Sequence, residues 1–217
     1  MNDDDVFAEN GPDGAKQKAR KQRVPAKVTP KNLENVALHY LERFSTSCEG
    51  LRRVLMRRVR RSSYHHGTDA DEAKDWVDQV VDKMRARGFV NDRLFAEGRV
   101  RTLLAQGVPL RGIRMRLREK GIADDIVADV VDLVAADDGD VDLAAAIALA
   151  KRRRLGPFIT RADREQRRDK DLAALARAGF GYDIARRVID AESVEALEDM
   201  KRDDAGAGGL GYFRDED

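Results

Sequence analysis

Apolar residues recur along this chain with the spacing of amphipathic helices. Between Leu33 and Phe44 they fall at i, i+3, i+4, i+7, i+8 and i+11, directly after a Thr29-Pro30 pair that is typical of a helix start. Comparable patterns return as far as Leu197, separated by short turns that contain glycine, proline or clustered polar residues. The pattern predicts an all-α protein built from short helices.

Three helix ends share one motif: a glycine, a hydrophobic residue, and then an Asn or Asp. The motif occupies residues 88–92, 121–125 and 179–183. Glycine suits a left-handed helix end, and the Asn or Asp can cap the next helix. The hydrophobic residue, Phe89 or Phe180 for example, is expected to fold back onto the last turn and lock it. The motif therefore predicts a helical unit that has been copied along the chain.

The apolar positions that flank these turns also repeat. The first copy carries Leu38, Leu41, Leu51 and Leu55, and the corresponding later positions are Val100, Leu103, Ile113 and Leu117, and then Leu172, Leu175, Ala185 and Ile189. Copies with shared apolar positions bury those faces against one another. We therefore expect an array of small helical modules rather than one sandwich or barrel.

Turn signals divide the chain into five segments. Residues 29–90, 91–138 and 139–200 are expected to form three three-helix repeats. Residues 1–28 are acidic and then basic, and residues 201–217 are Gly-rich with an acidic end. Both terminal segments have too few apolar residues to offset the entropy of ordering, so we expect them to be disordered.

Charge and cysteine content limit the function classes. The 41 Lys and Arg residues nearly balance the 40 Asp and Glu residues, and the net charge of +1 means that any basic surface must be local. One cysteine, Cys48, excludes an intramolecular disulfide, and with three histidines it disfavours a structural zinc site. The longest apolar run, residues 143–150, is far shorter than the ~20 residues of a membrane span. The acidic N-terminus does not read as a signal peptide, so we expect a cytoplasmic protein with no membrane role.

The sequence offers no recognisable catalytic motif. It contains no phosphate-binding Gly-x-x-x-x-Gly-Lys-Ser/Thr loop, no Gly-x-Ser-x-Gly nucleophile elbow and no His-Glu-x-x-His zinc pair. Cys48 has no partner that the sequence defines, which is typical of a structural cysteine. We expect a protein that is not an enzyme and needs no cofactor or metal.

Three basic clusters are the candidate binding residues. They are, in chain order, Arg52, Arg53, Arg57, Arg58, Arg60 and Arg61; Arg111, Arg114, Arg118 and Lys120; and Lys151, Arg152, Arg153 and Arg154. Arginine binds carboxylates and phosphates through two parallel hydrogen bonds, so such clusters favour an acidic groove or a nucleic-acid backbone. The first two clusters could also be solvated helix faces, an alternative that weighs more for the second than for the first. The third cluster stands at an expected helix C-terminus, where cations interact favourably with the helix dipole.

Three segments together resemble RecX regulatory proteins. They are Arg-Gly-Phe-Val-Asn-Asp-Arg-Leu-Phe-Ala-Glu at 87–97, Arg-Glu-Lys-Gly-Ile at 118–122 and Ala-Gly-Phe-Gly-Tyr-Asp-Ile at 178–184. The resemblance implies an elongated, curved all-α protein that binds the RecA recombinase filament on single-stranded DNA. It also implies that the protein hinders filament growth, ATP hydrolysis and co-protease activity. We expect the protein to be a monomer.

The first repeat departs from the family pattern. The family often carries a Tyr-Ser-Arg-x-Glu-Leu turn, of which residues 46–51 retain only Ser47 and Leu51. Two other functions stay open on the residues alone. A helix-turn-helix transcription factor would place one helix in the DNA major groove, and a helical scaffold would bind another protein without any effect of DNA.

Overall fold

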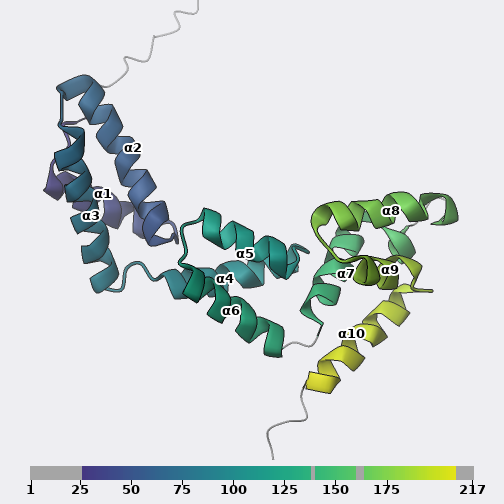
Figure 1. Ribbon diagram of the computed structural model, residues 1–217. Coiled ribbons are helices and arrows are strands. Elements are labelled where there is room, and N and C mark those ends of the chain that lie inside the picture. The colour runs from purple at the N-terminus through teal and green to yellow at the C-terminus, as the bar shows by residue number, and fades with distance from the viewer. Residues whose placement is uncertain (1–25, 138–139, 160–163, 209–217) are drawn as a thin grey trace, which may run out of the picture.

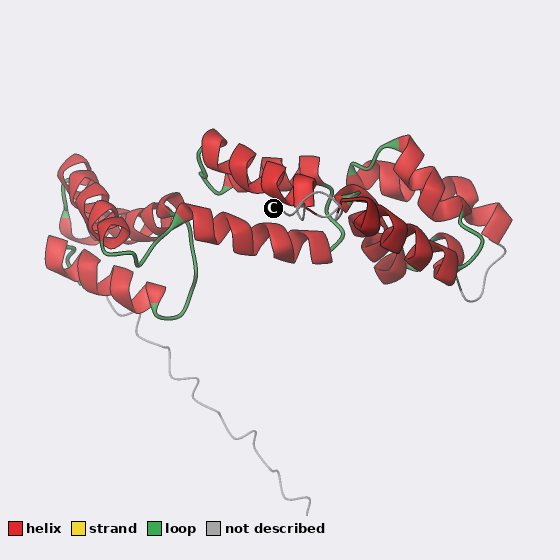
Figure 2. Ribbon diagram, turned by 90° about the horizontal axis from the view of Figure 1, so that it is seen from below, coloured by secondary structure: helices red, strands yellow, loops and turns green. Residues whose placement is uncertain are grey.

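The computed structural model describes residues 26–137, 140–159 and 164–208. Within these residues the chain forms α-helices, one short 3-10 helix and no strand, which confirms the all-α prediction. The helices lie in three groups that follow one another in an elongated, bent row (Figures 1 and 2). Their bounds are α1 Pro30–Leu41, α2 Cys48–His66 and α3 Ala70–Ala86; α4 Asp92–Ala105, α5 Leu110–Glu119 and α6 Asp124–Asp137; and α7 Val141–Arg153, α8 Arg164–Ala178, α9 Tyr182–Asp190 and α10 Val194–Gly208.

Each group has its own hydrophobic core. Leu51, Leu55 and Met84 are fully buried in the first core, and Val100, Leu103 and Ile113 are fully buried in the second. The third core lies around α7, α8 and α9 and includes Leu197 from α10. The described chain therefore buries its apolar side chains in three small clusters, as expected for an array of modules.

The glycine ends of three helices have the predicted geometry. Gly88 and Gly121 both have φ of 75°, and Gly179 has φ of 100°, all in the left-handed region. At each end the next backbone N–H donates to a carbonyl five residues earlier, as from Phe89 to Met84 at 3.0 Å. Phe180 and Ile122 are buried as the expected locks. Phe89 was wrongly predicted as a lock, because it is 53% exposed and the next residue, Val90, is buried in its place.

Substitution of the helix-end glycines tests this geometry. Gly88→Val and Gly121→Val are each expected to lower the free energy of unfolding by roughly 1 kcal/mol or more, because a β-branched residue resists a left-handed conformation. The Gly121 variant should lose more of its free energy of unfolding, because its new Cβ would lie 2.4 Å from the Cβ of Glu49. Urea denaturation of each variant beside the parent chain measures the difference. Unchanged midpoints would contradict the helix-end assignment.

The structure corrects the predicted bounds at several places. The third segment, 139–200, was predicted to hold three helices but contains α7, α8, α9 and the start of α10. A break at residues 191–193 separates α9 from α10, although the apolar spacing of Val188 and Ile189 continues into Val194 and Leu197. The α10 helix then runs to Gly208, past position 201, where the disordered tail was predicted to begin.

The start of the described chain also differs from the prediction. Val28, assigned to the N-terminal tail, is buried against the first core. Its backbone N–H donates to the hydroxyl of Ser62 at 2.9 Å, and Ser62 lies 2.7 Å from the hydroxyl of Thr68. These hydrogen bonds tie the segment before α1 to the end of α2. The rest of the predicted N-terminal tail, residues 1–25, lies outside the described residues.

Candidate partner-binding surface

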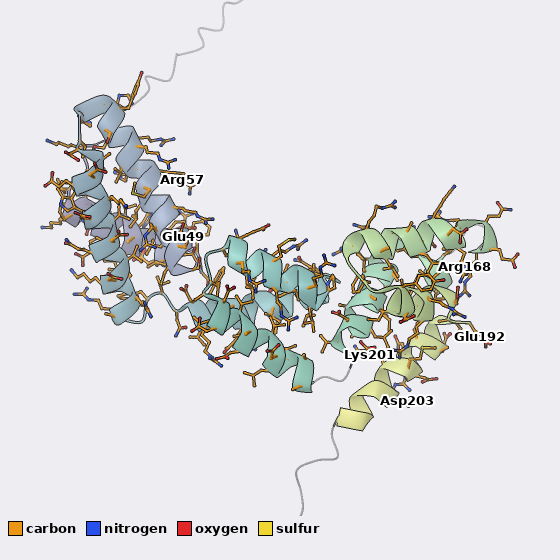
Figure 3. All side chains as sticks on the ribbon, in the orientation of Figure 1. Glu49, Arg57, Arg168, Glu192, Lys201 and Asp203 are labelled. Atoms are coloured by element: carbon orange, nitrogen blue, oxygen red, sulfur yellow. The ribbon has the colours of Figure 1, made fainter. Side chains whose placement is uncertain are left out.

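The α2 helix presents the first basic cluster. Ser47 caps its start by accepting from the N–H of Gly50 at 3.0 Å, and Gly67 ends it with φ of 62°. Leu51, Leu55 and Val59 are buried along one face. The arginines between these positions therefore point away from the core, and Figure 3 labels Arg57 midway along the helix.

Two arginines near the start of α2 are held by ion pairs. The Nε of Arg52 lies 2.7 Å from Oδ1 of Asp78, and this hydrogen bond raises the pKa of the guanidinium. The Nε of Arg53 lies 2.8 Å from Oε1 of Glu49, which also lies close to Arg52. Both charges are therefore balanced within the molecule and are poor candidates for partner binding.

The remaining four arginines of the cluster differ in their contacts: one is hydrogen-bonded to a neighbouring helix, and three are exposed without an ion pair among the described residues. Arg58 is half-buried and donates to the side-chain oxygen of Asn32 at 3.1 Å. Arg57, Arg60 and Arg61 are exposed, and in the described part of the chain no carboxylate lies within ion-pair distance of them.

Arg57, Arg60, Arg61 and Tyr64 fall at i, i+3, i+4 and i+7, so they share one side of the helix, which we call the outer face of α2. Tyr64 was missed by the sequence analysis, and it is 86% exposed. Its spacing from Arg57 was the signal that could have found it. Because a tyrosine ring can stack on a base, the outer face combines three free cations with one stacking group.

The second basic cluster, on α5, is also partly neutralised. Arg114 lies 2.7 Å from Asp132, and Arg118 lies 2.5 Å from Asp124, so both join α5 to the region of α6. Arg111 and Lys120 are exposed and have no ion pair among the described residues. Only half of the predicted cluster is therefore available to a partner.

The third basic cluster occupies the end of α7. Lys151, Arg152 and Arg153 form its last turn, and Arg154 ends it in a left-handed conformation with φ of 55°. All four side chains are exposed. Cations at a helix C-terminus interact favourably with the helix dipole, which is the structural interpretation of this cluster, and the exposed side chains also remain accessible to a partner.

Backbone and side-chain hydrogen bonds join the first group to the second. The hydroxyl of Ser47 donates to the carbonyl of Lys120 at 2.6 Å, and Arg53 donates to the carbonyl of Glu119 at 3.0 Å. The backbone N–H of Cys48 donates to Oδ1 of Asp92 at 2.8 Å. Ser47, which the resemblance had singled out as retained, thus serves both as a helix cap and as a junction contact.

Cys48 lies at this junction, and its thiol has low nucleophilic reactivity. Burial, followed by the nearby carboxylate of Asp92, raises the pKa of its thiol to about 11. At neutral pH the thiol is protonated and therefore a weak nucleophile. Within the described residues no three His, Cys, Asp or Glu side chains gather as a metal site, and no described helix is long and apolar enough for a bilayer.

Alkylation measures the state of this thiol. Iodoacetamide should modify Cys48 at least about tenfold more slowly in the folded protein than in urea at pH 8.5, because the thiolate is the reactive form. The folded rate should keep rising with pH up to about 11, whereas the rate in urea should level off near the ordinary thiol pKa. Because the unfolded thiol loses its proton first, the native state should also lose stability between the ordinary thiol pKa and that value. Equal rates at pH 8.5 would contradict the shift.

Comparison with known proteins places the chain in a family. The model of the family "RecX, second three-helix domain" matches residues 91–131, which span α4, α5 and most of α6. Regulatory protein RecX of Myxococcus xanthus (strain DK1622) is 44% identical over 184 residues, covering 84% of this chain and 96% of that protein. Regulatory protein RecX of Agrobacterium fabrum is 29% identical over 169 residues, covering 78% of this chain and 87% of that protein.

A solved structure shows the same fold. The crystal structure of RecX from Lactobacillus salivarius superposes with a TM-score of 0.52 at 22% sequence identity. The match covers 74% of this chain and 94% of that one. With the long match to the Myxococcus protein, this agreement confirms the resemblance found in the sequence, and the chain belongs to the RecX family of regulatory proteins.

Proposed function

We propose that this chain binds the filament that the RecA recombinase forms on single-stranded DNA and inhibits its growth, ATP hydrolysis and co-protease activity. It does so as a cytoplasmic monomer, without catalysis and without a cofactor. Family membership supports the regulatory role. The observation that carries the binding proposal is the outer face of α2, where three exposed arginines have no carboxylate partner in the described structure.

The arginines of this face are not balanced by carboxylates within the described residues. The chain as a whole has a net charge of +1, so long-range attraction to DNA is weak. Elsewhere many arginines are paired, as Arg168 is with Asp190 at 2.7 Å. Unpaired arginines need no internal contact to be broken before they bind phosphates or acidic side chains. The elongated row of helical groups suits a partner that is itself a continuous helical groove (Figure 2).

The helix-turn-helix alternative is less well supported. Reading base edges in the major groove relies on arginine together with Asn or Gln side chains. The sequences of α2, α5 and α9 contain no Asn or Gln. Exposed arginines without amides suit phosphate contacts, which position a protein but do not specify a sequence. A scaffold with no link to DNA would use the free arginines of α2 only for acidic side chains of a protein partner.

Titration of the recombinase tests the proposal. The chain is added to the recombinase of the same cell while single-stranded-DNA-dependent ATP hydrolysis is followed, with free single-stranded and duplex DNA binding measured in parallel. Inhibition at less than one chain per recombinase subunit is expected. No inhibition together with tight, sequence-selective duplex binding would favour the transcription factor. If the chain neither inhibits ATP hydrolysis nor binds single-stranded or duplex DNA, the scaffold is favoured.

A further inference from the structure

A groove of about 450 Å³ lies between α7 and α10, in the group farthest from the outer face of α2 (Figure 1). Its floor is apolar and includes Ile147, Phe158 and Leu197. Its rim is largely basic and is formed by Lys151, Lys201 and Arg202. Binding grooves are mostly apolar with a few polar groups that orient the ligand, and this groove has both kinds of surface.

Among the described residues, one of the three cations on the rim has an ion pair and two have none. Arg202 lies 2.9 Å from Asp199 and is paired. Lys151 and Lys201 have no carboxylate within ion-pair distance among the described residues, and Glu198 is the acid that lines the groove. The groove therefore favours a segment that offers large apolar side chains next to several carboxylates.

The chain itself contains such a segment. Residues 209–217 directly follow α10 and read Gly-Leu-Gly-Tyr-Phe-Arg-Asp-Glu-Asp. Leu210, Tyr212 and Phe213 are large apolar residues, and three carboxylates come after them. The order of the segment, apolar and then acidic, matches a floor and rim of the same two kinds.

The segment is also long enough to reach the groove. From Lys201 to Gly208 the helix rises about 10 Å at about 1.5 Å per residue. Residues 209–213 span up to about 17 Å when extended. Because Gly208 and Gly209 permit a reversal of the backbone, Tyr212 and Phe213 can return to the level of Lys201.

We propose that residues 210–217 dock in the groove between α7 and α10 of their own chain. The aromatic side chains of Tyr212 and Phe213 cover the apolar floor, and the carboxylates that follow pair with Lys151 and Lys201. This contact is independent of filament binding through α2.

A peptide in trans tests the contact. A fluorescein-labelled peptide of residues 209–217 is titrated by anisotropy with the full chain and with a chain that ends at Gly208. The shortened chain should bind the peptide, and the full chain should bind it about tenfold more weakly. That factor follows from a tethered segment at about 1 mM effective concentration competing with a peptide of about 100 μM affinity.

Variants of the shortened chain locate the contact. Lys151→Glu and, separately, Ala148→Trp, which fills the groove, should each abolish peptide binding, whereas Lys170→Glu on α8 should leave it unchanged. A peptide with Phe213→Ser should bind at least tenfold more weakly. No binding by the shortened chain, equal binding by both chains, or equal loss in the Lys151 and Lys170 variants would overturn the proposal. So would dimerisation of the full chain alone, because the segment would then dock on a second copy.

Discussion

Reversing two charges on the outer face of α2 is expected to raise the concentration of this chain that half-inhibits filament ATP hydrolysis by about 100-fold. The double variant is Arg57→Glu with Arg61→Glu. It removes two cations that have no internal partner and sets two anions against an acidic or phosphate-lined groove. A loss of about 1.4 kcal/mol for each reversed contact corresponds to this factor. Dose–response curves of ATP hydrolysis, recorded beside the parent chain, measure it.

A matched variant separates the position of the charges from their number. Lys74→Glu with Lys170→Glu makes the same change in net charge at two exposed lysines on α3 and α8, neither of which has an ion pair among the described residues. This control should inhibit nearly as well as the parent chain. Circular dichroism should show unchanged helicity in both double variants. If the two lose inhibition equally, the contact surface is not the outer face of α2.

Replacing Gly107 by alanine is expected to destabilise the protein by about 3 kcal/mol, the sum of the left-handed conformation and overpacking. Gly107 has φ of 69°, and a Cβ there would lie 2.6 Å from the backbone N of Leu149 and 2.8 Å from the carbonyl of Ala145. Both atoms belong to the backbone of α7, so α4 and α7 must move apart. Urea denaturation followed by circular dichroism measures the loss.

Gly88→Ala is the matched control for this effect. Gly88 has φ of 75°, but a Cβ there would meet no atom within 4 Å. Its loss should be only about 1 kcal/mol, the cost of the left-handed conformation itself. The difference between the two variants reports how closely the second and third groups pack. Equal losses would contradict the close approach of α7 to Gly107.

Much of the fold could be predicted because its signals are local. A glycine followed by an apolar residue and a cap is readable from a few neighbours, and it located the ends of α3, α5 and α8. The break between α9 and α10 was missed because the apolar spacing of Val188 and Ile189 continues into Val194 and Leu197. Ser193, whose hydroxyl accepts from the N–H of Ala196 at 3.2 Å, was the readable start signal.

The binding surface was only partly predictable because ion pairs depend on tertiary contacts. Arg52 and Arg114 stand in segments that are poor in acids, so they looked free. Asp78 and Asp132, which neutralise them, come from other helices of the same group. By contrast, Arg57 and Arg61 remained free because no neighbouring helix places a carboxylate beside them in the described structure. Selecting among the arginines therefore required the packed helices.

The most direct test of filament binding is co-sedimentation with preformed recombinase filaments. Filaments are assembled on single-stranded DNA with a non-hydrolysable ATP analogue and pelleted with increasing amounts of this chain. Recombinase without DNA and single-stranded DNA without recombinase are treated in parallel. Saturable recovery in the filament pellet, well above both controls and reduced by the double charge reversal on α2, is the predicted result. Recovery no greater than with DNA alone would contradict the claim that this protein recognises the filament.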